Sequence, residues 1–267
     1  METMGSCILS IDSLQIGYGS GSRRRILLPS LSASANRGEL VAVIGRNGIG
    51  KSTLLRSIIG LQPFYGGSIM INGENLSGIP RLELARKTGY ISTEIIRVSN
   101  MTVYDLVALG RFPHTNWIGR IDNRSREAIT GAISKTGLNQ LAGRYVTELS
   151  DGERQRVMIA RVLAQDADIM VMDEPTAFLD LPGKYEIMNL IRNLSRSGKT
   201  VIFSTHDINL ALRLTDRIWL ILKDRLIEGP PAELLKNGSF DSLFESDEPG
   251  KSISLGSNVQ DYLKNFL

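Results

Sequence analysis

Cysteine is nearly absent from this chain, since Cys7 is the single one among 267 residues. An intrachain disulfide is therefore excluded, and a reducing compartment is compatible with the composition. Long apolar runs are absent too, because no stretch approaches the roughly 18 residues that a membrane-spanning helix needs. The start of the chain has neither a basic segment nor a long apolar one, which argues against a secretory signal. We therefore expect a protein that is made and kept in the cytoplasm.

Internal repeats, heptad arrays and low-complexity tracts are also missing, and what remains has the composition of a globular protein. Hydrophobic residues make up 42% of the chain and charged residues 22%. The length allows one large domain or two modest ones, at roughly 150 residues per domain. A net charge of +3 and a pI of about 9.0 permit contact with nucleic acid or an anionic membrane but require neither. The basic run Arg23–Arg25 is interpreted most simply as a solvated loop between two strands.

Two kinds of strand pattern divide the chain. Apolar and polar residues alternate in 8–18 and again in 68–76, where Asn72-Gly73 is a hairpin signal, so an antiparallel part is predicted near the start. Three other runs are apolar without alternation, as expected of parallel strands that are covered on both faces. These runs are 40–45, 168–173 and 200–205. A helical segment follows each of them, so the order predicts an α/β fold with helices packed on a parallel sheet.

The middle of the chain lacks good strand patterns. Residues 102–110 and 124–138 are typical of helices that glycines terminate, which predicts a helical insertion over about 95–150. From Gly229 onward, prolines and glycines interrupt the pattern, so a less regular C-terminal extension is expected over 229–267.

A glycine-rich segment, GRNGIGKST, follows the first apolar strand. It fits the G-x-x-x-x-G-K-[ST] pattern and leads into a helix, so strand, loop and helix occur in the order that a phosphate loop requires. Glycines let backbone N–H groups close around oxygens, and the helix N-terminus adds positive potential. Lys51 is expected to reach the outer phosphates, and the Ser52 hydroxyl to bind Mg²⁺. The residues assigned to the nucleotide are Gly45, Arg46, Asn47, Gly48, Ile49, Gly50, Lys51, Ser52 and Thr53.

This loop alone does not decide the function, because GTPases, small-molecule kinases, motors and transport ATPases share it. The sequence DIMVMDEPT adds two acids at the end of a buried strand, where a parallel sheet delivers ligands to its carboxyl edge. Asp173 is expected to hold Mg²⁺, and Glu174 to act as general base toward the attacking water. The plainer alternative is an acidic pair that opens a turn before Pro175.

His206 ends the third apolar run and is expected at the same sheet edge. Most isolated histidines are structural, but this position allows His206 to hydrogen-bond the γ-phosphate or to orient Glu174. We therefore predict Lys51, Glu174 and His206 as the catalytic set.

The stretch from Leu149 to Asp180 names a family. It begins LSDGE and runs through the acidic pair, and it resembles the signature and second acidic motif of the ATP-binding-cassette (ABC) ATPases, in which the signature usually reads LSGGQ. Ser150-x-x-Glu153 is at the same time a capping box that starts the next helix. Both interpretations hold together, because main-chain donors near Gly152 stay available for a phosphate. The acids Asp151 and Glu153 are expected to point away from ATP.

The resemblance covers 8–228 and implies a P-loop NTPase fold with a RecA-like sheet, using ATP and Mg²⁺. In this family two subunits pack head to tail, and each signature closes over the ATP of its partner. The resemblance thus implies that Ser150 and Gly152 serve a second copy of the chain and that Asp180 lies at the shared interface. Tyr18 matches the aromatic residue that stacks on adenine, although a plain tyrosine at a strand end is the alternative.

One position departs from the family pattern. A glutamine that reaches Mg²⁺ and senses the membrane partner is usual there, but this chain has Thr93, with Glu94 beside it. Thr93 is too short to copy the reach of a glutamine, so either Glu94 substitutes or a water bridges, and the sequence leaves both open.

The segment VALGRFPHTNWIGR resembles the importers of iron chelates, haem and cobalamin, although Arg111-Phe112-Pro113 also suits a plain helix-stop turn. The resemblance implies an ATPase subunit that sits peripherally at the cytoplasmic face of the membrane on a multi-span permease, to which a binding protein delivers the substrate.

Two other classes of protein remain as alternatives. The first is a non-transport ABC ATPase that acts on nucleic acid or ribosomes. It usually carries coiled-coil insertions or two cassettes, and neither is visible here, nor is a basic-aromatic stripe for nucleic acid. The second is a small-molecule kinase, which has no use for the signature helix.

Overall fold

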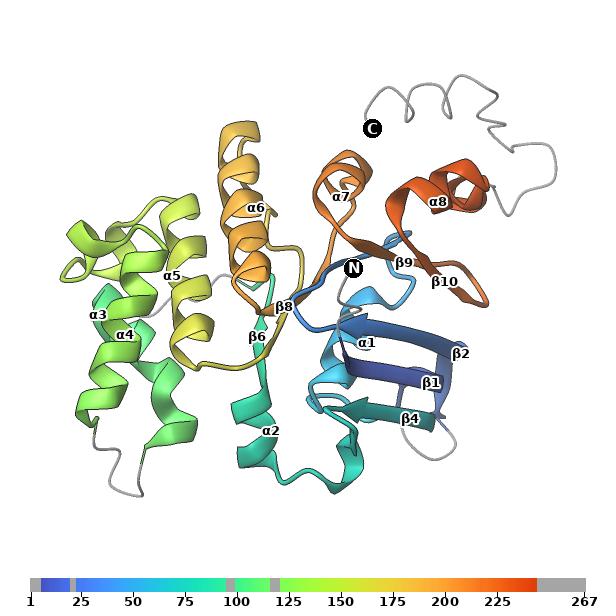
Figure 1. Ribbon diagram of the computed structural model, residues 1–267, viewed down its shortest axis with the longest axis horizontal. Helices are drawn as coiled ribbons and strands as arrows, with labels where there is room; N and C mark the ends of the chain where they lie inside the picture. The colour runs from blue at the N-terminus through green and yellow to red at the C-terminus, as the bar shows by residue number, and fades with distance from the viewer. Residues whose placement is uncertain (1–5, 20–22, 95–98, 116–120, 244–267) are drawn as a thin grey trace.

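The computed structural model describes residues 6–19, 23–94, 99–115 and 121–243 (Figure 1). Within them, two sheets and a group of helices build the fold. The larger sheet has the strand order β10-β9-β3-β8-β7-β6 and is parallel except for the antiparallel edge pair of β9 and β10. Its strands are β3 (Leu40–Gly45), β6 (Thr88–Ile91), β7 (Ile169–Met172), β8 (Thr200–Ser204), β9 (Arg217–Ile221) and β10 (Leu226–Gly229). The three apolar runs of the sequence are thus parallel strands, as predicted.

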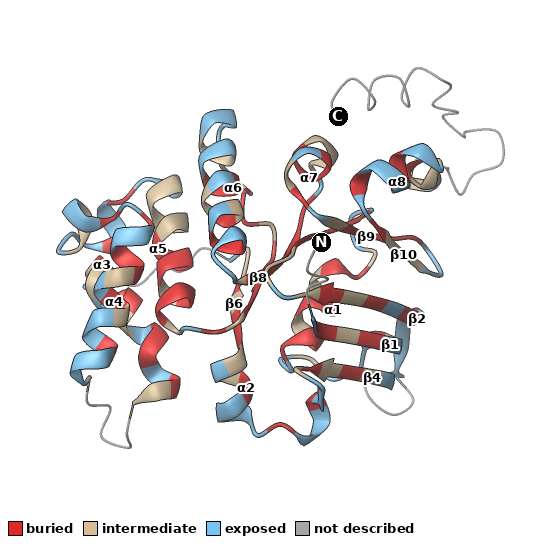
Figure 2. Cartoon of the chain, in the orientation of Figure 1, coloured by how far each residue is buried: buried red, intermediate tan, exposed pale blue. Residues whose placement is uncertain are grey.

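Alternating residues of the central strands face two separate hydrophobic cores. In β3, Leu40, Ala42 and Ile44 join one core, whereas Val41 and Val43 join the other. The strands β7, β8 and β9 alternate in the same way, and Figure 2 shows buried residues along β8 and β9. Because both faces are covered, the middle of each of these strands is apolar, where a half-exposed strand would alternate with polar residues.

Helices cover one face of this sheet. They are α5 (Asp151–Ala164), α6 (Leu181–Arg196), α7 (Ile208–Leu214) and α8 (Pro231–Lys236), and the residues that they bury belong to the first core. On the other face lie α1 (Lys51–Ile58), α2 (Arg81–Lys87) and the smaller sheet, which enclose the second core. The predicted α/β architecture is confirmed.

The smaller sheet is antiparallel, with the order β2-β1-β4-β5. Its strands are β1 (Cys7–Tyr18), β2 (Arg25–Asn36), β4 (Gly66–Ile71) and β5 (Glu74–Asn75). Asn72 and Gly73 join β4 to β5 with φ of 52° and 79°, so both central turn residues are left-handed, as a tight hairpin turn requires. The predicted antiparallel part and its hairpin are therefore confirmed.

Between β6 and α5 lie α3 (Val103–Ala108), the 3-10 helix η3 (Leu109–His114) and α4 (Asn123–Lys135), and both α-helices pack against α5. The helical insertion is present, but Gly110 does not end a helix as predicted. A Cβ at Gly110 would lie 2.0 Å from the Arg161 carbonyl oxygen, so this glycine lets η3 approach the last turn of α5. Arg111 and His114 then bond the carbonyl oxygens of Ala164 and Gln165 at 2.8 and 2.9 Å. The LGRFP segment thus closes the C-terminal end of α5.

The described part of the expected C-terminal extension is packed rather than loose. Helix α8 and the 3-10 helix η6 (Ser239–Leu243) bury Leu234, Leu235 and Phe240 in the first core. Residues 244–267 lie outside the described ones, and the predicted domain boundaries stay predictions. Across the part of the chain that the structure describes, no helix combines the length and the apolar character that a bilayer crossing demands.

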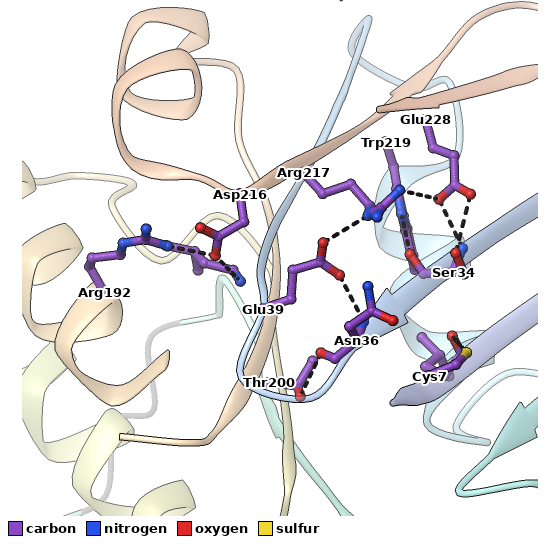
Figure 3. Close-up of polar contacts among 12 residues, drawn as sticks. Cys7, Ser34, Asn36, Glu39, Arg192, Thr200, Asp216, Arg217, Trp219 and Glu228 are labelled. Carbon is purple, nitrogen blue, oxygen red and sulfur yellow. Dashed lines mark hydrogen bonds and ion pairs between the residues drawn. The ribbon is translucent and has the colours of Figure 1, made fainter. Parts of the chain in front are cut away.

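A polar network ties the two sheets together at the edge where the parallel strands begin (Figure 3). The Glu228 carboxylate accepts hydrogen bonds from the backbone N–H and the hydroxyl of Ser34, at 2.9 and 3.2 Å. Arg217 lies between Glu39 and Glu228, with N–O distances of 2.9 and 3.8 Å. Glu228 therefore links β10 to β2 of the other sheet.

This network predicts a stability effect that is separate from the chemistry. Glu228→Ala removes the acceptor of two hydrogen bonds and leaves a strand N–H without its partner, so the free energy of unfolding should fall by about 2 kcal/mol. Urea unfolding measures it, and Glu233→Ala, at an exposed position on α8, is the matched control with an effect within about 0.5 kcal/mol. Equal stability of the two variants would contradict a stabilising link between β10 and β2 through Glu228.

Candidate functional site

The glycine-rich loop leaves the end of β3 and turns directly into α1. Gly48 and Gly50 have φ of 76° and 119°, in the region that side chains rarely adopt, so glycine is needed at both positions. Arg46, Asn47 and Gly48 are exposed at the tip of the loop, whereas Gly50 is buried at the helix start. The loop therefore has the shape that the sequence predicts for binding phosphates.

The N-terminus of α1 is left bare. No side chain caps Gly50, and no acidic residue lies in the first turn. Among the other α-helices of the described structure, five have a side-chain cap, supplied by Thr102, Asp122, Ser150, Asp180 and Asp207. Helices α2 and α8, which begin after prolines, have none. Free N–H groups and the positive end of the helix dipole make the N-terminus of α1 a site for an anion.

Lys51 is buried beneath the loop. Its Nζ donates to the carbonyl oxygens of Gly45 and Arg46 at 2.9 and 3.3 Å, and since an ammonium has three N–H donors, one remains for a ligand. Burial lowers the pKa of Lys51, and the charges of Glu174 and Asp173 act in the opposite direction. The two acids are thus close enough to Lys51 to stabilise its positive charge.

Tyr18 and Thr53 contact each other across the loop. Their hydroxyl oxygens lie 2.6 Å apart, and Thr53 is buried. Tyr18 is 52% exposed, so a base can reach it. This geometry joins the predicted adenine residue to the helix that carries the phosphate site, while its stacking role stays a prediction.

The acid pair lies beside the loop because of strand register. Val43 of β3 pairs with Ser204 of β8, and Met172 of β7 pairs with Phe203 of the same strand. Asp173 therefore emerges at the same edge of the sheet as the phosphate loop, with the strand β8 between them.

Ser204 holds both acids. Its hydroxyl donates to Asp173 Oδ1 at 2.7 Å and accepts from the backbone N–H of Glu174 at 2.9 Å. Glu174 has a φ of 48°, which is unusual for a residue other than glycine and marks a locally strained turn. Our sequence interpretation missed Ser204, although a buried serine one residue before the end of the run VIFST was a signal for a polar role at this edge.

His206 lies near Glu174 without a hydrogen bond to it. The distance from its Nδ1 to Glu174 Oε2 is 3.8 Å, and its side chain is 61% exposed, so it is free to turn toward a ligand. The structure thus brings Lys51, Glu174 and His206 to one edge, and their catalytic roles stay predictions.

The position that departs from the family pattern is used differently here. The Thr93 hydroxyl donates to the backbone carbonyl of Asp173 at 3.0 Å, so it fixes the main chain of the acid pair. Glu94 is exposed, and its charge adds to the effects that raise the pKa of Arg56, the largest of which is the hydrogen bond with Tyr90. Neither side chain contacts Lys51, and metal binding by Thr93 or Glu94 remains a prediction.

The signature segment forms the N-terminus of α5. Ser150 and Glu153 make the full capping box, with Glu153 bonded to the Ser150 N–H and hydroxyl at 2.8 Å each. These bonds hold the pKa of Glu153 below its usual range. Asp151 pairs with Arg154 on the same helix, so both acids have partners within α5. A Cβ at Gly152 would meet nothing within 4 Å, which leaves its main chain open to a partner.

Asp180 caps α6, accepting from the Gly183 N–H at 3.0 Å. It lies on an exposed loop that also carries Phe178, whose φ is 65° and whose side chain is 71% exposed. Its predicted place at an interface between two copies stays a prediction.

The donor set at this edge fits Mg²⁺. Asp173 Oδ1 is held by Ser204, and neither Asp173 Oδ2 nor the Ser52 hydroxyl makes a hydrogen bond to the described residues. A hydroxyl and one carboxylate are typical protein ligands of Mg²⁺, which takes the rest of its shell from waters and phosphates. Within the described ranges no cluster of three or more His, Cys, Asp or Glu could bind a metal.

A parallel sheet covered on both faces, with a glycine-rich loop, a buried lysine and an acid pair at its carboxyl edge, defines a P-loop NTPase. The family model described as ABC transporter matches residues 28–177, which is more than half of the chain. This chain belongs to the ABC transporter family, and it is an ATP-binding ATPase of that family.

Relatives support the assignment over nearly the whole length. The achromobactin transport ATP-binding protein of Dickeya dadantii is 36% identical over 236 residues, which covers 88% of this chain and 86% of the relative. The iron(3+)-hydroxamate import ATP-binding protein of Bacillus subtilis is 33% identical over 241 residues, covering 90% and 88%.

Solved structures agree with the sequence relatives. A metal-chelate type ABC transporter in an inward-facing conformation superposes with a TM-score of 0.77 at 27% identity, over 90% of this chain and 89% of that one. A dimeric ATP-binding cassette in a post-hydrolysis state, bound to ADP and Pi, gives a TM-score of 0.71 at 27% identity, over 84% and 99%.

The position of Ser204 predicts a catalytic defect without a binding defect. Ser204→Ala leaves the Glu174 N–H and one Asp173 oxygen without their partner, so kcat for ATP should fall about tenfold or more while KM changes by less than about threefold. Ser195→Ala is the matched control, because it removes another buried hydroxyl, which bonds the Gly38 carbonyl at 2.8 Å away from this edge. If the two variants have the same kcat in a steady-state ATPase assay, Ser204 does not hold the acids for catalysis.

Proposed function

We propose that this chain is the ATP-hydrolysing subunit of an importer for ferric siderophores or related iron chelates. Two copies would work head to tail on a multi-span permease at the cytoplasmic face of the membrane, and a binding protein would deliver the substrate to the permease. The observation that carries this proposal is the match over most of the chain to subunits named for iron-chelate import. These names favour import over a role in repair, translation or small-molecule phosphorylation.

The residues of the site suit the hydrolysis of ATP. The bare end of α1 and the remaining donor of Lys51 would bind the phosphates, and Tyr18 would support the base. Ser52 and Asp173 would hold Mg²⁺, which supplies neutralisation of phosphate charge when bound. Glu174, whose backbone Ser204 fixes, would accept the proton of the attacking water.

The signature segment supports a shared site. Ser150 and Gly152 lie on α5, which packs against the helical insertion, whereas the phosphate loop leads into α1 beside β1, β3 and β8. The two halves of the nucleotide site therefore lie on different parts of the fold, and a head-to-tail pair would bring each signature to the ATP of the other copy. The dimeric form of the ADP-bound cassette agrees with this arrangement.

A groove near the acid pair is a suitable place for the permease. It lies between the end of α1, α2, β6 and α5, with a volume of about 580 Å³, and Tyr90 and Ser92 line it together with Arg161. Leu61 at its rim is 66% exposed. Because Ser92 lines the groove and is adjacent to Thr93, which bonds the main chain of Asp173, an occupant of the groove would touch a residue next to one that contacts the acid pair.

The function is tested by growth on a limiting nutrient. A strain that lacks this gene should fail to grow when a ferric siderophore is the iron source and recover when the wild-type gene returns. Growth on haem and on cobalamin is measured in parallel and should be unaffected. A growth defect confined to haem or cobalamin would mean that this compound, and not an iron chelate, is the substrate. Normal growth on all three would contradict the proposal that the chain serves an importer of this kind.

The role of Glu174 predicts that binding and turnover separate. Glu174→Gln keeps the size of the side chain but removes the base, so ATP affinity should stay within about twofold of wild type while turnover falls by about a hundredfold or more. Lys51→Ala is the contrasting variant and should lose ATP binding itself, as calorimetry would show. Turnover close to wild type in Glu174→Gln would remove Glu174 from the role of base.

A further inference from the structure

The two carbonyl groups that flank Tyr18 are held from outside the strand. Gln62 Nε2 donates to the Gly17 carbonyl at 2.8 Å, and the Tyr65 hydroxyl donates to the Gly19 carbonyl. The Tyr65 backbone N–H also donates to the Gln15 carbonyl at 2.8 Å. The segment 62–65, between α1 and β4, therefore forms hydrogen bonds with the end of β1 on both sides of Tyr18.

The end of this strand has little room to shift. A Cβ at Gly17 would lie 2.1 Å from the Arg25 carbonyl oxygen, and a Cβ at Gly19 would lie 2.3 Å from that of Arg23. The backbones of β1 and of the start of β2 thus approach more closely than any side chain allows. The Tyr18 ring projects from this narrow end, with its own hydroxyl on Thr53.

Arg24 contacts Tyr65 and Gln15, which lie at the same end of β1. Its guanidinium carbon lies 3.9 Å from the centre of the Tyr65 ring, and its NH2 group donates to Gln15 Oε1 at 3.5 Å. The cation thus stacks on the ring that bonds Gly19, which restricts the orientation of that ring. Tyr65 therefore joins the ends of both strands.

We propose that Gln62 and Tyr65 are positioning residues for the nucleotide base, because they fix the backbone on both sides of Tyr18 and so present its ring to adenine. The inference rests on the proposed function, in which Tyr18 supports the base. Because neither residue belongs to the phosphate loop, we expect their replacement to weaken the binding of the base more than that of the phosphates. This distinguishes them from residues that merely stabilise the fold.

The test compares a ligand that has a base with one that has none. Calorimetry without divalent metal, so that nothing is hydrolysed, gives the affinities of the full chain for ATP and for inorganic tripolyphosphate. Tyr65→Phe and Gln62→Met should each weaken the affinity for ATP by about fivefold, which corresponds to the loss of one hydrogen bond. The affinity for tripolyphosphate should change by less than about twofold. Tyr104→Phe, on α3, is the matched control and should change neither affinity.

A double variant decides whether the effect passes through Tyr18. Tyr18→Ala should weaken the affinity for ATP but not for tripolyphosphate, and adding Tyr65→Phe to it should weaken the affinity for ATP no further. Suppose that Tyr18→Ala weakens only the affinity for ATP, but Tyr65→Phe and Gln62→Met weaken the affinities for both ligands equally, or neither. The inference is then wrong, while the role of Tyr18 in supporting the base stands. If Tyr18→Ala leaves the ratio of the two affinities unchanged, the assignment of Tyr18 in the proposed function fails, and the inference fails with it.

Discussion

The pairing of β3, β8 and β7 is the constraint on which the site depends. Each strand is short, and each ends at the same edge of the sheet, so their registers fix where the next residues emerge. The phosphate loop follows β3, the acid pair follows β7, and Ser204 ends β8 between them. A slip of one residue would turn every buried side chain to the other face, and both hydrophobic cores oppose it. The packing of the sheet thus positions the catalytic edge.

The helix that carries the phosphate loop lacks a side-chain cap. Ser150 and Asp180 satisfy the first N–H groups of α5 and α6 with their side chains, whereas α2 and α8 begin after prolines and have no side-chain cap. Helix α1 has no such cap, and its first residue, Lys51, is buried and donates to the carbonyl oxygens of Gly45 and Arg46 in the loop. A helix start with unsatisfied donors and a buried ammonium is costly in the free protein, and an anionic ligand offsets that cost.

Much of this could be predicted from the sequence, because local patterns determine it. Apolar runs without alternation predict the parallel strands, and the spacing from Gly45 to Ser52 predicts the loop. Contacts between distant segments left weaker signals. Ser204 acts through Asp173 and Glu174 on another strand, and Tyr65 through the carbonyl of Gly19, so neither residue has a local motif. The turn after α3 was interpreted as a helix stop at Gly110, since its packing against the Arg161 carbonyl depends on tertiary structure.

The central claim is that one chain holds half of a working site and a second copy completes it. A structure of the Glu174→Gln variant with ATP and Mg²⁺ tests this most directly. The account predicts two copies with ATP in the seam between them, in which Lys51 of one copy and Ser150 of the other contact the same triphosphate. A single copy with ATP fully enclosed by its own residues, and with residues 149–153 far from any nucleotide, would contradict it.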